Sequence, residues 1–247
     1  MASPFKSLVH DDECYDKSFA VFKMHIDAHQ YKKDFICKTL PDHLASIGDG
    51  KSIKIIGLGT GEGDYDIEML SHMRLKHPGV LLDNEVVEPS ALRIYKYKER
   101  AAQMSHLDPV NFTWHQMTAS KFEEQWRQRN ITKKVDFIHM LHVWTRTWFP
   151  QRNTADIKQL LDEAGVPYQS YKVPAMLDIT DCFTEGHETG ELILNFITEM
   201  VNFRKTAPHE LREGVLRMLQ DPQCSMEKNG RILLNTCEEF IIVEATD

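Results

Sequence analysis

The first half of the chain alternates between short apolar runs and amphipathic stretches. The apolar runs predict strands at 53–56, 84–87, 110–115 and 135–141, the last of them buried. Between and after the strands, helical periodicity covers 66–76, 90–103 and 121–129. Since helices separate the strands throughout, the pattern predicts an α/β fold in which a parallel sheet carries its helices as crossover connections.

The flanking segments predict further helices and a few strands. Upstream of the first strand, residues 14–40 have helical spacing with aromatics on one face, as expected for two helices broken near residues 28–30. A helix is expected over 154–164, with Thr154 as its cap and Gly165 as its terminator. The other elements expected are a strand at 168–173, helices at 191–201 and after Pro208, and a last strand at 232–235 that continues at 240–243.

Composition and charge narrow the class of protein. The 247 residues suffice for one large α/β domain, or a domain with a small appendage. The net charge is -8 and the basic residues are interspersed with acids, so the footprint of a nucleic-acid-binding protein is missing. No apolar run reaches the length of a membrane span and no signal peptide opens the chain, so a cytoplasmic protein is expected. The five cysteines contain no C-x-x-C pair, which argues against a disulfide framework and a zinc site.

The strand at 53–56 leads into glycines at 57, 59, 61 and 63, before the helix that starts near Asp66. A strand, a glycine-rich turn and a helix in this order can hold a nucleotide-like cofactor, although a turn without ligand is equally compatible with the glycines alone. Glu88 favours the cofactor, because an acid at the end of the second strand can accept two hydrogen bonds from a ribose diol. A nicotinamide-dependent oxidoreductase would share both features.

Two histidines stand near the end of the fourth predicted strand. His139 and His142 are three residues apart, so on an extended strand they point to opposite faces and are poorly placed to share a metal ion. His142 lies where ligands bind in open parallel sheets, and it is a candidate for orienting a substrate ring. A strand-end histidine in contact with solvent is the competing interpretation.

Several strings resemble the histamine N-methyltransferase family, a group of class I S-adenosylmethionine-dependent methyltransferases. The strings are Val86–Ser90, Asp136–Met140, Asp178–Phe183, Thr206–Pro208 and the opening Met1–Ser3 with Ser7 and Leu8, and they span nearly the whole chain. The resemblance implies a Rossmann-like sheet with helices on both faces. It also implies that residues 1–50 form a helical substrate-binding segment and residues 51–247 a methyltransferase domain with C-terminal helical insertions.

The resemblance also implies site residues and a reaction, the transfer of a methyl group from S-adenosylmethionine to an imidazole nitrogen of histamine. The residues implied on the cofactor side are Gly59, Gly61, Glu88, Arg93, Ala119 and Leu141, and Thr118 or Ser120 is a candidate to replace the polar side chain that Ala119 lacks. Those implied on the substrate side are Tyr15, Phe19, Phe22, Ala28 and Thr236, to which the strand-end position adds His142. Side chains differ from the family's pattern at five of these positions, where the chain has Arg93, Ala119, Leu141, Ala28 and Thr236. Asp27 and Asn235 neighbour the last two, but an adjacent residue on a helix points about 100° away.

The segment 142–153 is too short for the crossover helix and fifth strand that a parallel sheet needs after the fourth strand. We therefore expect a shortened or divergent family member whose sheet lacks one strand and whose neighbouring backbone groups and apolar faces are left unpaired. Two alternatives to histamine methylation follow, a methyltransferase for another small amine and a catalytically impaired homologue that still binds cofactor. We expect a monomer, and no obligatory catalytic base, because a neutral imidazole is itself nucleophilic.

Overall fold

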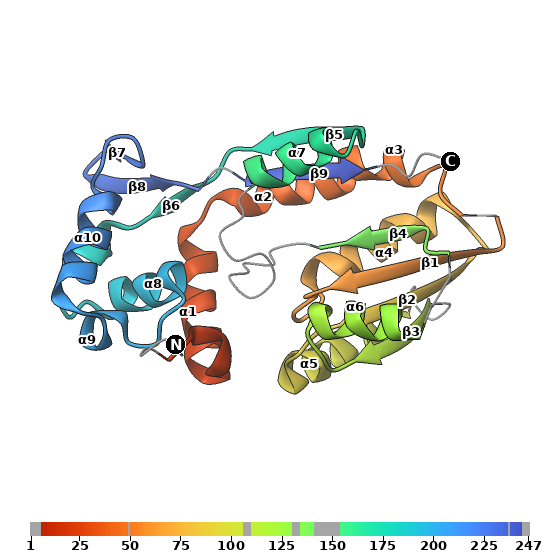
Figure 1. Ribbon diagram of the computed structural model, residues 1–247, viewed down its shortest axis with the longest axis horizontal. Coiled ribbons are helices and arrows are strands. Elements are labelled where there is room, and N and C mark those ends of the chain that lie inside the picture. The colour runs from red at the N-terminus through yellow and green to blue at the C-terminus, as the bar shows by residue number, and fades with distance from the viewer. Residues whose placement is uncertain are drawn as a thin grey trace. The chain divides into compact units, whose positions relative to one another are not determined.

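The computed structural model describes residues 6–48, 50–105, 110–129, 134–140, 154–236 and 238–243 (Figure 1). Its contacts group the chain into two compact units, residues 33–157 and residues 1–32 with 158–247. The assignment of substrate binding to residues 1–50 concerns ligands and stays a prediction. Among the described residues no helix has the length and apolar character needed to cross a membrane.

The unit 33–157 is built on a parallel sheet. Its strands are β1 (Ser52–Leu58), β2 (Leu81–Val87), β3 (Val110–His115) and β4 (Phe137–His139), in the order β3-β2-β1-β4. Gly57 at the end of β1 lies in register with Val86 on one side and His139 on the other. The parallel sheet predicted from the spacing of apolar runs is confirmed, and the predicted bounds of β3 coincide with the observed ones.

Helices cover both faces of this sheet, as expected. They are α4 (Asp64–Lys76), α5 (Ala91–Ala102) and α6 (Ala119–Gln128). Ile56 belongs to a buried cluster with Phe122 of α6, whereas the next residue, Gly57, faces Asp66 of α4. Since consecutive strand residues point to opposite faces, α4 and α6 lie on opposite sides. Before β1, a π-helical turn (Phe35–Thr39) and α3 (Leu40–Leu44) pack against α4.

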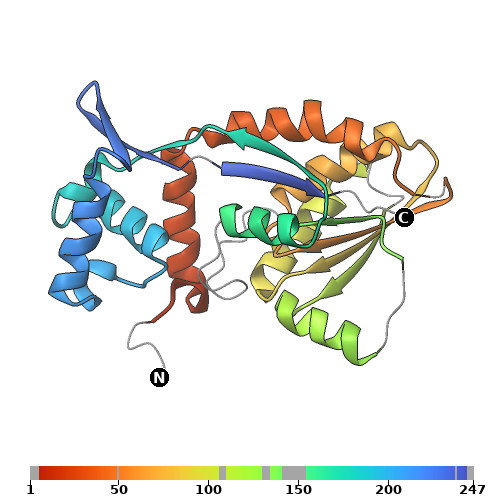
Figure 2. The same cartoon turned by 45° about the horizontal axis from the view of Figure 1, so that its top comes forward.

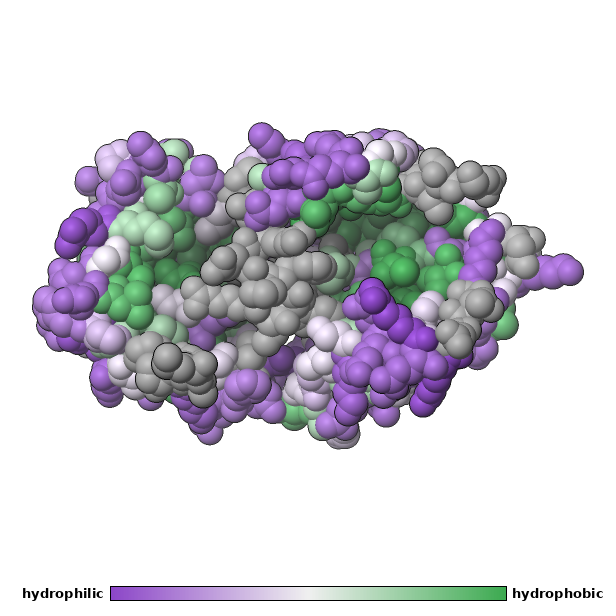
Figure 3. All heavy atoms as spheres, viewed as in Figure 1, coloured by the Kyte–Doolittle hydropathy of each residue, from purple (hydrophilic) through white to green (hydrophobic). Residues whose placement is uncertain are grey.

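The strand β4 differs from the buried strand predicted for 135–141. It spans three residues, and Ile138 leaves 56% of its surface exposed, while His139 is buried. Figure 3 shows hydrophobic side chains reaching the surface over the region of β1 and β4. Within the described part of the chain, β4 pairs with β1 alone. The prediction of a buried strand was wrong for Ile138, because among the described residues β4 lies at the edge of the sheet with this side chain exposed.

The other unit combines helices with two small antiparallel sheets. Its N-terminal elements are a 3-10 turn (Leu8–His10), α1 (Asp12–His25) and the first part of α2 (Ala28–Asp34). Helix α7 (Thr154–Glu163) contains the division between the two units. It is followed by β5 (Tyr168–Val173), β6 (Met176–Asp178), a 3-10 turn (Thr180–Phe183), α8 (Glu188–Thr198), α9 (Phe203–Thr206), α10 (His209–Leu219), β7 (Ser225–Lys228), β8 (Arg231–Asn235) and β9 (Glu238–Val243). β5 pairs with β9, as Figure 2 shows, and β6, β8 and β7 form the second sheet.

Two predicted boundaries in this unit were wrong. The break between α1 and α2 falls at residues 26 and 27 rather than 28–30, because Ile26 is extended and forms a bridge with Leu177. The predicted last strand is two strands in different sheets. The ribbon of β5 with β9 ends where the Thr236 N–H bonds to the Ala175 carbonyl, and the pairing of β6 with β8 continues beyond that point.

Candidate functional site

The glycine-rich turn between β1 and α4 is held in left-handed conformations. Gly59, Gly61 and Gly63 have φ values of 66°, 59° and 77°, a region that is costly for residues with a Cβ atom. The Gly59 N–H bonds to the Val87 carbonyl at 2.8 Å and the Gly63 N–H to the Thr60 carbonyl at 3.1 Å. The turn is therefore fixed against the end of β2, and the predicted strand, turn and helix are confirmed.

Two glycines of this segment, Gly57 and Gly63, pack closely against neighbouring side chains, whereas Gly61 borders open space. A Cβ atom on Gly63 would come within 2.4 Å of the Tyr97 ring, and one on Gly57 within 2.9 Å of Asp66. A Cβ atom on Gly61 would meet nothing within 4 Å. Gly61 is thus a position where the backbone borders free space, so a ligand can approach its main chain closely.

Glu88 joins the glycine turn to the start of α5. Its side chain is buried, with 3% of the residue exposed, and its Oε2 accepts the Gly61 N–H at 3.0 Å. Its Oε1 accepts the Ser90 N–H at 2.9 Å and lies 3.7 Å from Arg93 Nη1. A carboxylate accepts hydrogen bonds at both of its oxygens, so Glu88 holds the turn and the start of α5 together. The sequence suggested the ligand role of Glu88 but gave no sign that it also orders the turn.

A buried polar cluster lies directly beneath the turn. Asp66 Oδ2 is 3.3 Å from the Tyr97 hydroxyl, and Asp66 Oδ1 is 3.7 Å from His139 Nδ1. Burial, reinforced by the charge of Glu88, raises the pKa of the Asp66 carboxyl to about 8. Burial lowers the pKa of the His139 imidazole to about 4. At pH 7 the contact between Asp66 and His139 therefore joins two mainly neutral groups and is not an ion pair.

Three predicted cofactor positions follow β3 and β4. Ala119 is buried at the start of α6 in the cluster with Ile56 and Phe122, whereas Ser120 is exposed. Thr118 caps the helix by accepting the Lys121 N–H at 3.3 Å. Leu141 lies outside the described residues, as does His142.

Aromatic side chains from α1 and α8 form a cluster in the other unit. The ring centroids of Tyr15, Phe19 and Phe22 lie 5.9, 5.5 and 4.4 Å from that of Phe196. Phe22 and Phe196 are buried in the core of this unit, while Tyr15 and Phe19 are half-buried. The structure brings the three predicted substrate aromatics together, and Tyr15 and Phe19 are the two with surface left for a ligand.

Two further predicted substrate residues are Ala28, at the start of α2, and Thr236, directly after β8. Ala28 is fully buried in the same apolar core. The side chain of Asp27 accepts the Met176 N–H at 2.7 Å, so it is committed to the backbone. The Thr236 hydroxyl is buried and, among the described residues, has no hydrogen-bond partner.

An ion pair one turn along α2 was not found by sequence reasoning. Lys32 is almost completely buried, and its Nζ lies 2.7 Å from Glu238 Oε1. Burial lowers the pKa of Lys32, and Glu238 opposes that shift. Lys32 follows Ala28 by four residues, so the two share a helix face, a relation that periodicity could have revealed, whereas the partner strand could not be read from the sequence.

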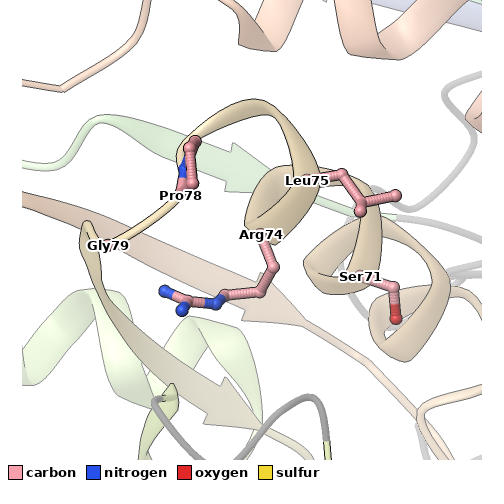
Figure 4. Close-up of a pocket in the computed structure, with 5 residues that line it drawn as sticks. All are labelled: Ser71, Arg74, Leu75, Pro78 and Gly79. Carbon is pink, nitrogen blue, oxygen red and sulfur yellow. The ribbon is translucent and has the colours of Figure 1, made fainter.

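A surface hollow of about 430 Å³ lies at the far end of α4 (Figure 4). It is lined by Ser71, Arg74, Leu75, Pro78 and Gly79, none of them a predicted site residue. The Arg74 guanidinium donates to the Val80 carbonyl and the Ser71 hydroxyl to the Ile67 carbonyl. Because cofactors in open parallel sheets bind at the carboxyl ends of the strands, this hollow is not the candidate cofactor site.

Comparisons with known proteins give a consistent result at the level of sequence. The chain is 42% identical to a histamine N-methyltransferase of Danio rerio, covering 99% of this chain and 100% of the relative. It is 35% identical to that of Bos taurus and 34% identical to that of Mus musculus, with at least 99% of each chain covered. No family model matches. A solved SAH-bound methyltransferase of Podospora anserina covers 95% of this chain and 97% of its own, but its TM-score of 0.31 and 11% identity are too low to argue from.

The alignment with the Danio rerio relative is longer than the chain itself. It extends over 291 residues, whereas the chain has 247. At least 44 aligned positions, the difference between 291 and 247, therefore have no counterpart in this chain. The short segment 142–153 led us to expect a shortened family member, and this deficit agrees with that expectation.

Proposed function

The chain belongs to the histamine N-methyltransferase family, and from that premise we propose that it transfers a methyl group from S-adenosylmethionine to a ring nitrogen of histamine. The identity of 42% over the full length of a relative carries the substrate half of this proposal. The hydrogen bond from Gly61 to Glu88 carries the cofactor half, because it joins an open glycine backbone to an acid at a strand end.

The residues of the turn are suited to S-adenosylmethionine. The open side of Gly61 gives room for the amino-acid end of the cofactor, and no phosphate site is needed there. Glu88, the acid that directly follows β2, would accept hydrogen bonds from the ribose hydroxyls. Arg93 is turned toward Glu88, and we assign it to holding that carboxylate rather than to touching the cofactor.

Methyl transfer to a neutral imidazole needs no strong general base from the protein. When bound, S-adenosylmethionine supplies an electrophilic methyl group on a sulfonium. A free imidazole has a pKa near 6.5, so its ring is mostly neutral at cytosolic pH and its nitrogen can attack without a strong base. The work of the protein is therefore to orient the ring in line with the methyl group and to exclude water. We assign ring contacts to Tyr15 and Phe19, and retain His142 as the polar candidate.

Two alternatives rest on specific observations. Ala28 is buried among apolar residues, so this position offers no charge to a substrate ammonium, which favours a different small amine. At least 44 missing aligned positions and the exposed Ile138 favour a homologue that binds cofactor without transferring a methyl group. A cytoplasmic location and a monomeric state stay predictions from the sequence.

A methylation assay with labelled cofactor over a panel of small amines distinguishes these functions. Transfer to histamine supports the main proposal, and transfer to another amine alone supports the first alternative. Cofactor binding by calorimetry without transfer to any amine supports the second. Absence of both binding and transfer would refute all three.

A variant at Glu88 tests the cofactor half separately. Glu88→Gln keeps the shape but removes the charge and two acceptor sites, so we expect weaker S-adenosylmethionine binding. Glu123→Gln is the matched control, because Glu123 forms an exposed pair with Arg127 on α6. Equal affinities of the two variants, measured on folded protein, would remove Glu88 from the site.

A further inference from the structure

A cluster of three potential metal ligands lies outside the candidate cofactor site. Cys37 belongs to the π-helical turn, and Glu68 and His72 lie on α4. Their ligand atoms, one from each residue, all lie within 4.8 Å of one another, and Cys37 Sγ is 3.3 Å from Glu68 Oε1. All three residues are half-buried. From these positions we propose that Cys37, Glu68 and His72 bind a zinc ion.

The separations are close to those of a bound ion. The donor atoms of a tetrahedral zinc site lie roughly 3.3–3.8 Å apart, because each is about 2.0–2.3 Å from the ion. The thiol and the carboxylate already meet this distance. Glu68 and His72 are four residues apart on one helix, so their side chains share a face and need at most an adjustment of about 1 Å.

The chemical types of the three ligands favour Zn²⁺ over other metal ions. A thiolate and an imidazole with one carboxylate suit Zn²⁺, whereas Ca²⁺ and Mg²⁺ prefer sites made wholly of oxygen ligands. The Cys37 thiol donates a hydrogen bond to the Glu68 carboxylate in the structure. On binding, the S–H bond breaks, the sulfur–zinc bond forms and the proton leaves to solvent. Three protein ligands leave a fourth position for water.

The scaffold beneath the cluster is already fixed. Ile36, next to Cys37, is buried, and the π-helical turn and α3 pack against α4. At the other end of this contact, His77 Nε2 lies 2.6 Å from the Leu44 carbonyl. Because both sides of the cluster are held by other contacts, little conformational freedom is lost on binding. A zinc ion here would stabilise α4, the helix that follows the glycine turn.

The sequence argued against zinc because no two cysteines are close. That reasoning covers local motifs such as C-x-x-C and misses ligands that a helix packing contact brings together. Cys37 and Glu68 are 31 residues apart, so their contact depends on how the turn packs on α4.

The test uses the full chain stripped of metal with a chelator. Zn²⁺ is titrated in competition with a chromophoric chelator, and Co²⁺ serves as a spectroscopic probe. We expect one tight site and a thiolate-to-cobalt charge-transfer band. Cys37→Ser should abolish that band and lower zinc affinity by more than about 10-fold, and His72→Gln should lower the affinity similarly. Zinc should also raise the unfolding temperature of the wild type but not of either variant.

Cys224→Ser is the matched control, because Cys224 is a half-buried free cysteine in the other unit. It should keep both the band and the affinity. Absence of a charge-transfer band in the wild type would overturn the proposal, as would Cys37→Ser binding zinc as tightly as Cys224→Ser. If Cys37→Ser does not fold, His72→Gln decides, since unchanged affinity in that variant would also overturn it.

Discussion

Replacing Gly63 with alanine separates the packing role of the glycine turn from its role toward a ligand. Gly63 has a φ of 77°, and an added Cβ would lie 2.4 Å from Cδ2 of Tyr97. Gly61→Ala is the matched variant, because its φ is also positive, at 59°, but its Cβ would meet nothing within 4 Å. The two substitutions therefore share backbone strain and differ in steric overlap.

The expected magnitudes follow from these two effects. An alanine in the left-handed region costs about 1–2 kcal/mol of folding free energy. The overlap adds about 1–3 kcal/mol, because Tyr97 is fully buried and protein interiors are close-packed. Gly63→Ala should thus lose roughly 2–5 kcal/mol and Gly61→Ala about 1–2 kcal/mol. Cofactor affinity should fall in Gly61→Ala even where its fold is intact.

Tryptophan fluorescence gives the measurement for the relevant unit. All four tryptophans of the chain lie within residues 33–157. Urea unfolding followed by this signal therefore reports the stability of that unit, and the shift of the midpoint at constant slope gives the change in free energy. Calorimetric titration of S-adenosylmethionine into the folded variants gives the affinity.

A double variant tests the assigned cause. Tyr97→Leu removes the ring that the new methyl group would strike, so Gly63→Ala should cost less in that background, with a coupling of roughly 0.5–3 kcal/mol. The reasoning is refuted if Gly63→Ala destabilises the unit no more than Gly61→Ala. Additive single substitutions, with no coupling to Tyr97, would refute it too.

Three further predictions concern buried groups. Because the folded pKa of Asp66 is raised to about 8, its stabilising contribution is full below its unfolded pKa and is lost as pH rises through 8. His139, whose pKa is lowered to about 4, opposes this loss of stability only below about pH 6.5. Between pH 6.5 and 8 the free energy of unfolding should therefore fall by up to about 1.4 kcal/mol per pH unit because of Asp66, and Asp66→Asn should remove this dependence in urea unfolding. Glu238→Gln should cost about 3–5 kcal/mol in thermal unfolding, and more than Lys32→Met, because it leaves the buried lysine without its carboxylate; equal costs would contradict this. Phe22→Ala should cost about 3–5 kcal/mol because the ring is buried in the core; a loss of substrate affinity without destabilisation would instead make Phe22 a pocket residue.

The sequence predicted the cofactor side of the fold well because its signals are local. Strand β3 and the succession of strand, glycine turn and helix can each be recognised from residues a few positions apart. The caps of α5 and α6, which were not predicted, are equally local, because Ser90 accepts the Arg93 N–H and Thr118 accepts the Lys121 N–H. Local chemistry of this kind can be read without knowing which elements meet in space.

What the sequence missed depends on contacts between distant segments. The pairing of Lys32 with Glu238 requires α2 to pack beside the start of β9, and the bridge of Ile26 to Leu177 determines where α1 ends. Strand β4 was predicted to be buried because its residues are apolar. Burial, however, depends on which distant elements pack around the strand, and in the described part of the chain β4 pairs with β1 alone and Ile138 is exposed.

This division between local and distant contacts bears on what a shortened chain can still do. The described hydrogen bonds of the candidate cofactor site join Gly61, Glu88 and Ser90, and the buried groups beneath them end with His139. All of these residues precede the segment 142–153, which is too short for the crossover helix and strand expected there. Loss of residues there leaves each of these contacts in place, because none of them uses a later side chain. Cofactor binding is therefore expected to persist whether or not methyl transfer does, so the two activities have to be measured separately.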